Sequence, residues 1–191
     1  MTRARALLLA LLLAGSSSAA GEAALTAGVF DPPRPAPEFA LRGSNGAELR
    51  LSQFRGKVVV LAFGFTSCPE VCPTTLATLA RARAKLGARS RDLQVLYVTV
   101  DPERDDSERM RSYLAGFDRS FLGATGSEAQ LAAVRRDYGV AADKKVVDGQ
   151  ASFAHSTSTY LIGRDGSLRA MMPYGHPADD YAHDVAILLE R

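Results

Sequence analysis

The hydrophobic pattern is strongest in two continuous apolar runs. Residues 57–65 read KVVVLAFGF and residues 93–100 read LQVLYVTV, and both are rich in β-branched and aromatic side chains. Such runs are typical of strands buried on both faces of a parallel sheet. Between them, apolar positions after Pro73 recur at helical spacing, and proline suits the first turn of a helix. A strand, a helix and a second strand in this order predict an α/β sheet with a parallel crossover.

The remaining elements are predicted from turn and capping signals. Asn45-Gly46 lies between alternating apolar positions, which predicts a β-hairpin over residues 39–54. A helix is expected from Asp105, with Glu108 completing a capping box. The other expected elements are a helix from Ser127 to Gly139, a hairpin across Asp165-Gly166, and a last helix whose buried face holds Ala178, Tyr181, Val185 and Leu188.

The first 20 residues have the pattern of a secretory signal peptide. Arg3 and Arg5 precede an apolar run, Ala6–Gly15, and Ser18-Ala19-Ala20 is a small-residue cleavage pattern. The alternative is an uncleaved membrane anchor, although the run is short for a span of roughly 20 residues. We therefore expect an exported protein in a bacterial periplasm, either soluble or tethered to the inner membrane by its leader. Disulfides can persist in that compartment.

Composition and charge narrow the classes further. The proline-rich segment 21–37 is expected to be an extended linker, so the folded domain would span residues 38–191. Apolar residues make up 47% of the 191-residue chain, which is enough for one domain with a core. The formal net charge of the whole chain is +2. The first 20 residues include two arginines and no acid, so residues 21–191 have a formal net charge of zero. No long basic run remains, so we expect no nucleic-acid partner.

Candidate chemistry centres on GFTSCPEVCP, residues 64–73, which holds both cysteines of the chain, Cys68 and Cys72. They lie where a buried strand leads into a helix, and N–H groups at a helix start favour a thiolate. Closing so short a loop with a disulfide would recover little entropy, so a structural staple is the weakest of three interpretations. The other two are a redox couple and a metal site.

His155 could complete a metal site. It directly precedes a predicted strand, and a loop at that position would pack against the cysteine loop. Two thiolates with one imidazole suit Cu(I), or Cu(II) with an added oxygen ligand. Zinc usually takes a fourth protein ligand or a water, and stays an alternative. A lone histidine beside a strand is more often structural, so the metal interpretation depends on its combination with the two cysteines.

Three stretches together resemble the Sco/SenC family of copper-binding, thioredoxin-like proteins: FGFTSCPEVCPTTLATL, YVTVDPERD and FAHSTSTYLIGRDG. The resemblance extends from Val29 to the C-terminus, with the motifs in the family's order. It implies an α/β, thioredoxin-like fold with an N-terminal β-hairpin extension, and it implies Cys68, Cys72 and His155 as copper ligands. It also implies delivery of copper to the binuclear copper site of cytochrome c oxidase, or maintenance of that site's thiols.

Two functions are compatible with this resemblance. A metallochaperone would pass copper by ligand exchange to the copper-site subunit of the oxidase, after loading by an upstream copper chaperone, and would not be an enzyme in that role. A thiol–disulfide oxidoreductase would use Cys68 and Cys72 as its redox pair, with a thiol reductant as partner. His155 separates the two, because it is needed for a copper site but optional for thiol exchange. A peroxidase of the peroxiredoxin type is a weaker third, since Thr66 lies near Cys68 but no arginine could be assigned to it.

Asp101 ends the second buried strand, and ligand sites gather at the carboxyl ends of parallel strands. It is a candidate to hydrogen-bond near the copper ligands or to help a partner dock, the alternative being an Asp-Pro turn with local backbone bonds. His176, His183 and the pair Met171-Met172 are weaker candidates. Adjacent strand positions face opposite sides of a sheet, so core packing of one methionine is the better interpretation.

Overall fold

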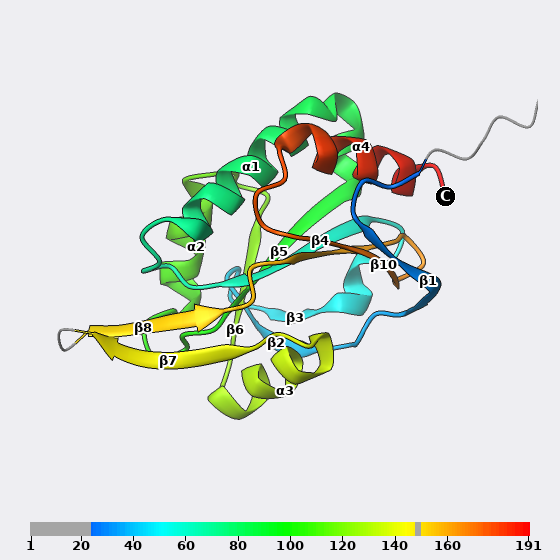
Figure 1. Cartoon of the computed structure of the whole chain (residues 1–191). Helices are drawn as coiled ribbons and strands as arrows, with labels where there is room; N and C mark the ends of the chain where they lie inside the picture. The colour runs from blue at the N-terminus through cyan, green and yellow to red at the C-terminus, as the bar shows by residue number, and fades with distance from the viewer. Residues whose placement is uncertain (1–23, 148–149) are drawn as a thin grey trace, which may run out of the picture.

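The computed structural model describes residues 24–147 and 150–191, so the predicted leader lies outside the described residues. Within these residues, no helix is long and apolar enough to cross a membrane. They form ten strands, four α-helices and two short 3-10 helices (Figure 1). In chain order the elements are β1 (Gly28–Pro35), β2 (Ala40–Gly43), β3 (Glu48–Arg50), η1 (Leu51–Phe54), β4 (Val58–Gly64), α1 (Val71–Lys85), η2 (Gly87–Asp92), β5 (Leu93–Thr99), α2 (Ser107–Ala115), β6 (Leu122–Thr125), α3 (Glu128–Tyr138), β7 (Ala142–Val147), β8 (Gln150–His155), β9 (Thr159–Ile162), β10 (Ser167–Met172) and α4 (Ala178–Leu189).

Eight of the described strands form one mixed sheet in the order β1-β10-β9-β4-β5-β6-β2-β3. The central strands β4, β5 and β6 run parallel, and the strands outside them pair antiparallel. Every residue of β4 and β5 is buried, as expected for two continuous apolar runs. Helices α1 and α4 pack together on one face of the sheet, and α3 lies on the other (Figure 1). The predicted α/β sheet with parallel crossovers is therefore confirmed.

The apolar faces of the helices account for both halves of the core. The four residues predicted to form the buried face of α4 are all buried, as are Leu76 and Leu79 of α1. On the opposite face of the sheet, the rings of Phe63, Tyr138 and Tyr160 pack against one another with centroids 5.2–6.1 Å apart. These contacts fix the ends of β4 and β9 next to the cysteine loop.

Both N-terminal segments belong to the sheet. The predicted hairpin forms as β2 and β3 around Gly46, whose positive φ of 84° glycine adopts without strain, and β2 also pairs with β6. The proline-rich segment is extended, but β1 pairs with β10. Just before it, the backbone N–H groups of Thr26 and Ala27 donate to the buried carboxylate of Asp184, at 2.8 and 2.9 Å. Residues 26–35 therefore pack as part of the domain, where the sequence predicted a linker.

Three further features of the fold differ from the prediction. Strand β6 and the hairpin β7–β8 were not predicted, because β6 has only four residues and β7, with the sequence ADKKVV, does not alternate between apolar and polar side chains. The predicted cap of α2 was wrong by one residue. Asp106 is the N-cap, and its side chain accepts a hydrogen bond from the Arg109 backbone N–H at 2.8 Å. Asp105 is instead completely buried, and its hydrogen bonds to the cysteine loop are described below.

Candidate metal centre

Cys72 and His155 meet although 83 residues separate them in sequence. Cys72 lies in the first turn of α1, and His155 is the last residue of β8. The Cys72 Sγ and the His155 Nε2 are 3.8 Å apart. The other ring nitrogen, Nδ1, is 2.7 Å from the carbonyl oxygen of Ser156. A carbonyl only accepts, so Nδ1 carries the proton and a neutral ring presents the lone pair of Nε2 to Cys72.

Cys68 lies beside this pair, at the half-exposed start of the loop. Both cysteines are free thiols, and Cys68 lies close enough to Cys72 to help raise the pKa of the Cys72 thiol. Within residues 24–147 and 150–191, no three or more His, Cys, Asp or Glu side chains are already arranged to hold a metal ion. The structure thus brings together Cys72 with His155 and Cys72 with Cys68, while the three side chains do not converge on one point.

Burial controls the protonation of both contacting groups. Burial raises the pKa of the Cys72 thiol to about 12, while hydrogen bonds from the Tyr97 hydroxyl and the Phe65 backbone pull it the other way. Burial also lowers the pKa of His155, against the effect of its bond to the Ser156 carbonyl. Both groups are therefore held neutral at physiological pH. A cavity of about 10 Å³ lined by Cys72 and His155 lies at this contact, near the lower limit (~10–15 Å³) for one water-sized particle.

A buried carboxylate that sequence reasoning placed elsewhere holds the cysteine loop. Asp105 accepts hydrogen bonds from the Thr66 backbone N–H at 3.0 Å and from the Thr66 hydroxyl at 2.6 Å. It also accepts one from the hydroxyl of Thr99, at the end of β5, at 2.7 Å. One carboxylate therefore joins the loop, the central sheet and the start of α2. Adjacent acids at 105 and 106 give no sequence signal for which one is buried.

Arg109 braces the same loop from α2. Its Nε donates to the Thr66 hydroxyl at 2.7 Å, and its Nη2 donates to the Ser67 hydroxyl at 3.0 Å. The sequence analysis found no arginine for Thr66, and the structure supplies one. Both contacts are to loop hydroxyl groups, so Arg109 positions the backbone that leads to Cys68.

The hairpin that ends in His155 is attached mainly through aromatic and charged side chains. The ring of Phe153 packs against Phe65 with centroids 5.4 Å apart, and the imidazole of His155 meets the same Phe65 ring edge-on at 6.0 Å. On β7, Lys144 Nζ pairs with a Glu103 carboxylate oxygen at 2.5 Å. Phe65, the residue after β4, is thus the common surface on which the hairpin rests.

Asp101, predicted to end the second buried strand, lies two residues after the end of β5 and is 1% exposed. Its carboxylate pairs with Arg104 Nε, and its carbonyl accepts from the backbone N–H groups of Arg104 and Asp105. The Arg104 guanidinium lies over the Phe65 ring, 5.8 Å from its centroid. Asp101 therefore reaches the site through Arg104 and Phe65, and among the described residues it forms no hydrogen bond or ion pair with the cysteines or His155.

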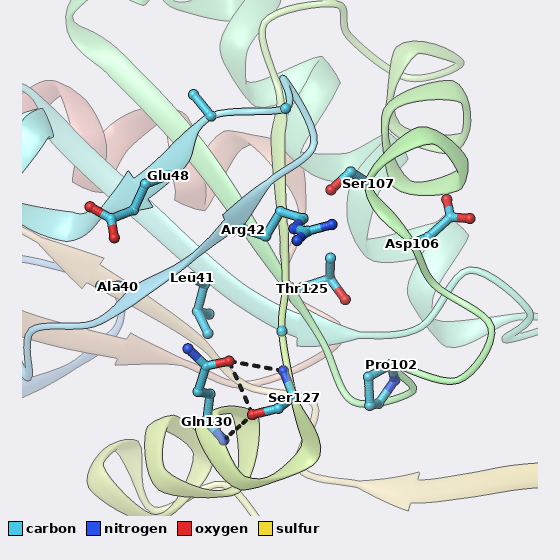
Figure 2. Close-up of a pocket in the computed structure, with 13 residues that line it drawn as sticks. Ala40, Leu41, Arg42, Glu48, Pro102, Asp106, Ser107, Thr125, Ser127 and Gln130 are labelled. Atoms are coloured by element: carbon cyan, nitrogen blue, oxygen red, sulfur yellow. Dashed lines mark hydrogen bonds between the residues drawn. The ribbon is translucent and has the colours of Figure 1, made fainter.

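The weaker candidates lie elsewhere. His176 Nδ1 pairs with Asp180 at 2.8 Å, and His183 Nδ1 pairs with Asp184 at 3.0 Å. Met172 is fully buried and Met171 is 36% exposed, so one methionine packs in the core as predicted. A cavity of about 500 Å³ lies between β2 and the starts of α2 and α3, with Arg42 and Ser127 in its wall (Figure 2). It contains none of the predicted ligands.

Known proteins match this arrangement in sequence and in structure. The SCO1/SenC family profile matches residues 31–190. Protein SCO2 homolog, mitochondrial, from Mus musculus is 40% identical over 134 residues, covering 68% of this chain and 52% of that protein. The chain thus spans about half the length of that mouse relative.

Two solved structures share the fold. The copper-bound structure of Bradyrhizobium japonicum ScoI has a TM-score of 0.75 and 31% identity, covering 81% of this chain and 99% of that one. The apo Sco1 protein of Thermus thermophilus has a TM-score of 0.72 and 37% identity, covering 86% and 94%. The predicted thioredoxin-like fold is confirmed by these likenesses. From its sequence match and its fold, the chain belongs to the SCO1/SenC family.

Proposed function

We propose that this chain binds one copper ion through the sulfurs of Cys68 and Cys72 and Nε2 of His155, and delivers it to the binuclear copper site of cytochrome c oxidase. The observation that carries the proposal is the apposition of Cys72 Sγ and His155 Nε2 at 3.8 Å. Two soft sulfurs and one imidazole are a donor set suited to Cu(I).

The separation of these two atoms fits a shared ion. Bonds to a first-row metal such as zinc measure roughly 2.3 Å for sulfur and roughly 2.0 Å for an imidazole nitrogen. Two such bonds to one ion put the donors roughly 3.5–3.8 Å apart, and the observed separation is 3.8 Å. The Ser156 carbonyl fixes the ring in the tautomer that can bind, since it holds the proton on Nδ1.

Cys68 supplies the third donor by reorientation of its side chain. It is half-exposed, it precedes α1, and its thiol already contacts Cys72. Such a ligand suits transfer, because an incoming acceptor thiolate can displace the most accessible donor first. The buried pair would then be displaced in later steps.

Family membership supports the proposed acceptor, and the leader pattern supports the proposed compartment. Members of the Sco family are described as cytochrome c oxidase assembly proteins, and the copper-site subunit of the oxidase is the acceptor we propose. The leader pattern supports export to a periplasm, where the chain would work close to the membrane. An upstream copper chaperone or a thiol reductant would meet the chain at the same exposed loop.

Thiol exchange with the acceptor is the second candidate function. It is favoured by the contact between two free thiols, one of them half-exposed. Cys68 would attack a target disulfide, and Cys72 would resolve the mixed disulfide. The raised pKa of Cys72 makes it a poor nucleophile at neutral pH, which counts against its resolving role.

An anaerobic competition titration of the reduced protein tests the proposal, with Cu(I) and Cu(II) measured separately. The variants are His155→Ala, Cys68→Ala with Cys72→Ala, and His183→Ala as a control, because His183 lies on α4 away from the site. We expect one-to-one binding that the double variant abolishes. His155→Ala should weaken it by more than the roughly 10- to 100-fold that loss of a residue supporting a ligand costs. Weak binding that is indifferent to His155 would contradict the proposal.

A further inference from the structure

The cavity of about 500 Å³ between β2 and the starts of α2 and α3 has an unpaired cation in its wall. The cation is the exposed side chain of Arg42, on β2. It forms no ion pair or side-chain hydrogen bond with any described residue, although Glu48 is its cross-strand neighbour on β3. Glu48 pairs instead with Arg50, with a carboxylate oxygen 2.6 Å from the Arg50 Nε. The Arg42 guanidinium therefore keeps its donors for another partner.

Thr125 lies beside Arg42 and has an unused hydroxyl. The two residues are register partners on β2 and β6, so their side chains lie on the same face of the sheet. Thr125 is 7% exposed, and its hydroxyl forms no hydrogen bond within residues 24–147 and 150–191. Figure 2 shows both side chains pointing from the sheet toward the start of α2. A buried hydroxyl without a partner is unfavourable, so this one favours an acceptor inside the cavity.

The first turn of α2 faces these two side chains. Its residue Ser107 has a buried hydroxyl that also lacks a hydrogen-bond partner in the described part of the chain. The first N–H groups of a helix have no partner within the helix and favour negative charge. The start of α3 is closed, because the Gln130 Oε1 accepts from the Ser127 backbone N–H and hydroxyl, at 2.9 and 3.0 Å (Figure 2). The unused donors therefore gather between Arg42, Thr125 and α2.

Two carboxylates also line the cavity, and each already has a partner. Glu48 is paired with Arg50. Asp106 caps α2, and its carboxylate accepts from the Arg109 backbone N–H at 2.8 Å. Figure 2 shows both carboxylates directed away from the Arg42 guanidinium. The space beside Arg42 is therefore suited to a negatively charged group.

We propose that this cavity binds a small molecule through an oxyanion group, either a phosphate or a carboxylate, held by the Arg42 guanidinium and the Thr125 hydroxyl at the start of α2. Arginine matches the geometry of both groups with two parallel hydrogen bonds. The cavity falls in the range of ~300–1,000 Å³ that is usual for small-molecule sites, so a bare ion would leave most of it unfilled. The three proposed copper ligands lie outside its wall, so this site does not depend on the proposed function.

Calorimetric titration of the metal-free, reduced protein tests the proposal at constant ionic strength. The probes are inorganic phosphate, glycerol 3-phosphate and citrate, which separate a free phosphate, a phosphate ester and a polycarboxylate. The variants are Arg42→Gln and Thr125→Val. Arg119→Gln is the matched control, because Arg119 is also exposed and has no ion pair among the described residues, but lies outside the cavity wall.

We expect saturable one-to-one binding of at least one probe, and the tightest probe identifies the class of oxyanion. Arg42→Gln should weaken it by about tenfold or more, and Thr125→Val by about tenfold, because each removes hydrogen bonds to a charged group. Arg119→Gln should leave the affinity within about twofold of the parent protein. Thr125→Val should not lower the urea midpoint of unfolding, because the hydroxyl that it removes has no partner in the described protein.

The outcomes separate a binding site from a merely structural cluster. Absence of saturable binding of all the probes, or equal weakening by Arg42→Gln and Arg119→Gln, would overturn the proposal. Binding that depends on Arg42 but is unchanged in Thr125→Val would also overturn it, because the anion would then lie on the surface and not in the cavity. A marked loss of stability in Thr125→Val would show that its hydroxyl serves the fold, which contradicts its role as a free donor. The titration contains no copper, so failure of this site and failure of the proposed copper function are distinguishable.

Discussion

The cysteine loop and the histidine hairpin reach the same point from two different kinds of structure. The loop joins β4, whose residues are all buried, to α1, and Cys72 is 3% exposed. Asp105 ties it to the sheet through three hydrogen bonds. The hairpin β7–β8 is a separate two-stranded sheet that projects beyond the main one (Figure 1). Its described side-chain attachments include the Phe153–Phe65 contact and the exposed pair Lys144–Glu103.

This difference assigns different tasks to the two halves of the proposed copper site. Segments with few buried contacts open locally at a small free-energy cost, whereas core strands open only when the whole domain unfolds. The loop therefore presents Cys72 in a fixed place, and the hairpin brings His155 to it. Once an acceptor has displaced Cys68, movement on the histidine side would open the rest of the proposed copper site.

The largest expected effect concerns the two thiols of the fixed half. Because burial raises the pKa of Cys72 to about 12, this thiol is neutral at pH 8 and its thiolate fraction grows with pH up to that value. Alkylation of Cys72 in the metal-free protein should be on the order of 1,000-fold slower than that of an exposed cysteine peptide at pH 8. Cys68 should be modified first. Mass spectrometry of partly alkylated protein measures this, and equal modification of both thiols would contradict a fixed, buried Cys72.

Asp105→Asn tests what fixes the loop. The amide keeps the shape but places a donor against the Thr66 N–H or a hydroxyl, so the free energy of unfolding should fall by about 2–4 kcal/mol. Asp106→Ala is the neighbouring control, since it removes only the cap of α2 and should cost about 1 kcal/mol. Urea denaturation measures both. If both variants lost the same free energy of unfolding, the buried Asp105 carboxylate would stabilise the protein no more than the helix cap at Asp106, which would contradict its role in fixing the loop.

Phe153→Ala tests the attachment of the hairpin. The ring is half-buried, so the loss in global stability should be about 1–2 kcal/mol, below the ~3–5 kcal/mol typical of a buried phenylalanine. Cu(I) affinity should fall by about tenfold, because His155 is then held less firmly. Chemical denaturation and chelator competition measure the two effects. An unchanged copper affinity would show that the hairpin does not need this contact to place His155.

Lys144→Ala should have the smallest effect. The Lys144–Glu103 pair is exposed, and exposed ion pairs contribute little that can be measured. Lys145→Ala, one residue along the same strand, is the matched control. Thermal unfolding at low and high salt should give the same midpoint for both variants and the parent. A salt-dependent loss confined to Lys144→Ala would mean that this pair anchors the hairpin after all.

The sequence predicted the elements whose pattern depends only on burial. The two apolar runs became β4 and β5, and the apolar face of the last helix is buried as predicted. The sequence did not predict β7–β8, because a hairpin outside the main sheet need not alternate strongly between apolar and polar residues. It also assigned the cap of α2 to Asp105 instead of Asp106. Only the hydroxyls of Thr66 and Thr99, brought in by tertiary packing, decide which of two adjacent acids is buried.

The candidate site shows the same division. Cys68, Cys72 and His155 could be named because sulfur and imidazole are rare in this chain and carry recognisable chemistry. The residues that support them could not. Tyr97 lies within a buried run whose side chains read as core, and Arg109 lies 43 positions after Thr66 in the sequence. Their roles depend on distances between segments, which residue spacing does not contain.

Hydrogen exchange read by mass spectrometry, with and without one equivalent of Cu(I), tests the central comparison most directly. We predict that backbone amides of β7 and β8 exchange faster than those of β4 and β5 in the metal-free protein. We also predict that Cu(I) slows exchange mainly in the hairpin, because the loop side is already held. Uniform protection across the sheet, or none in the hairpin, would contradict a site made of one fixed and one movable half.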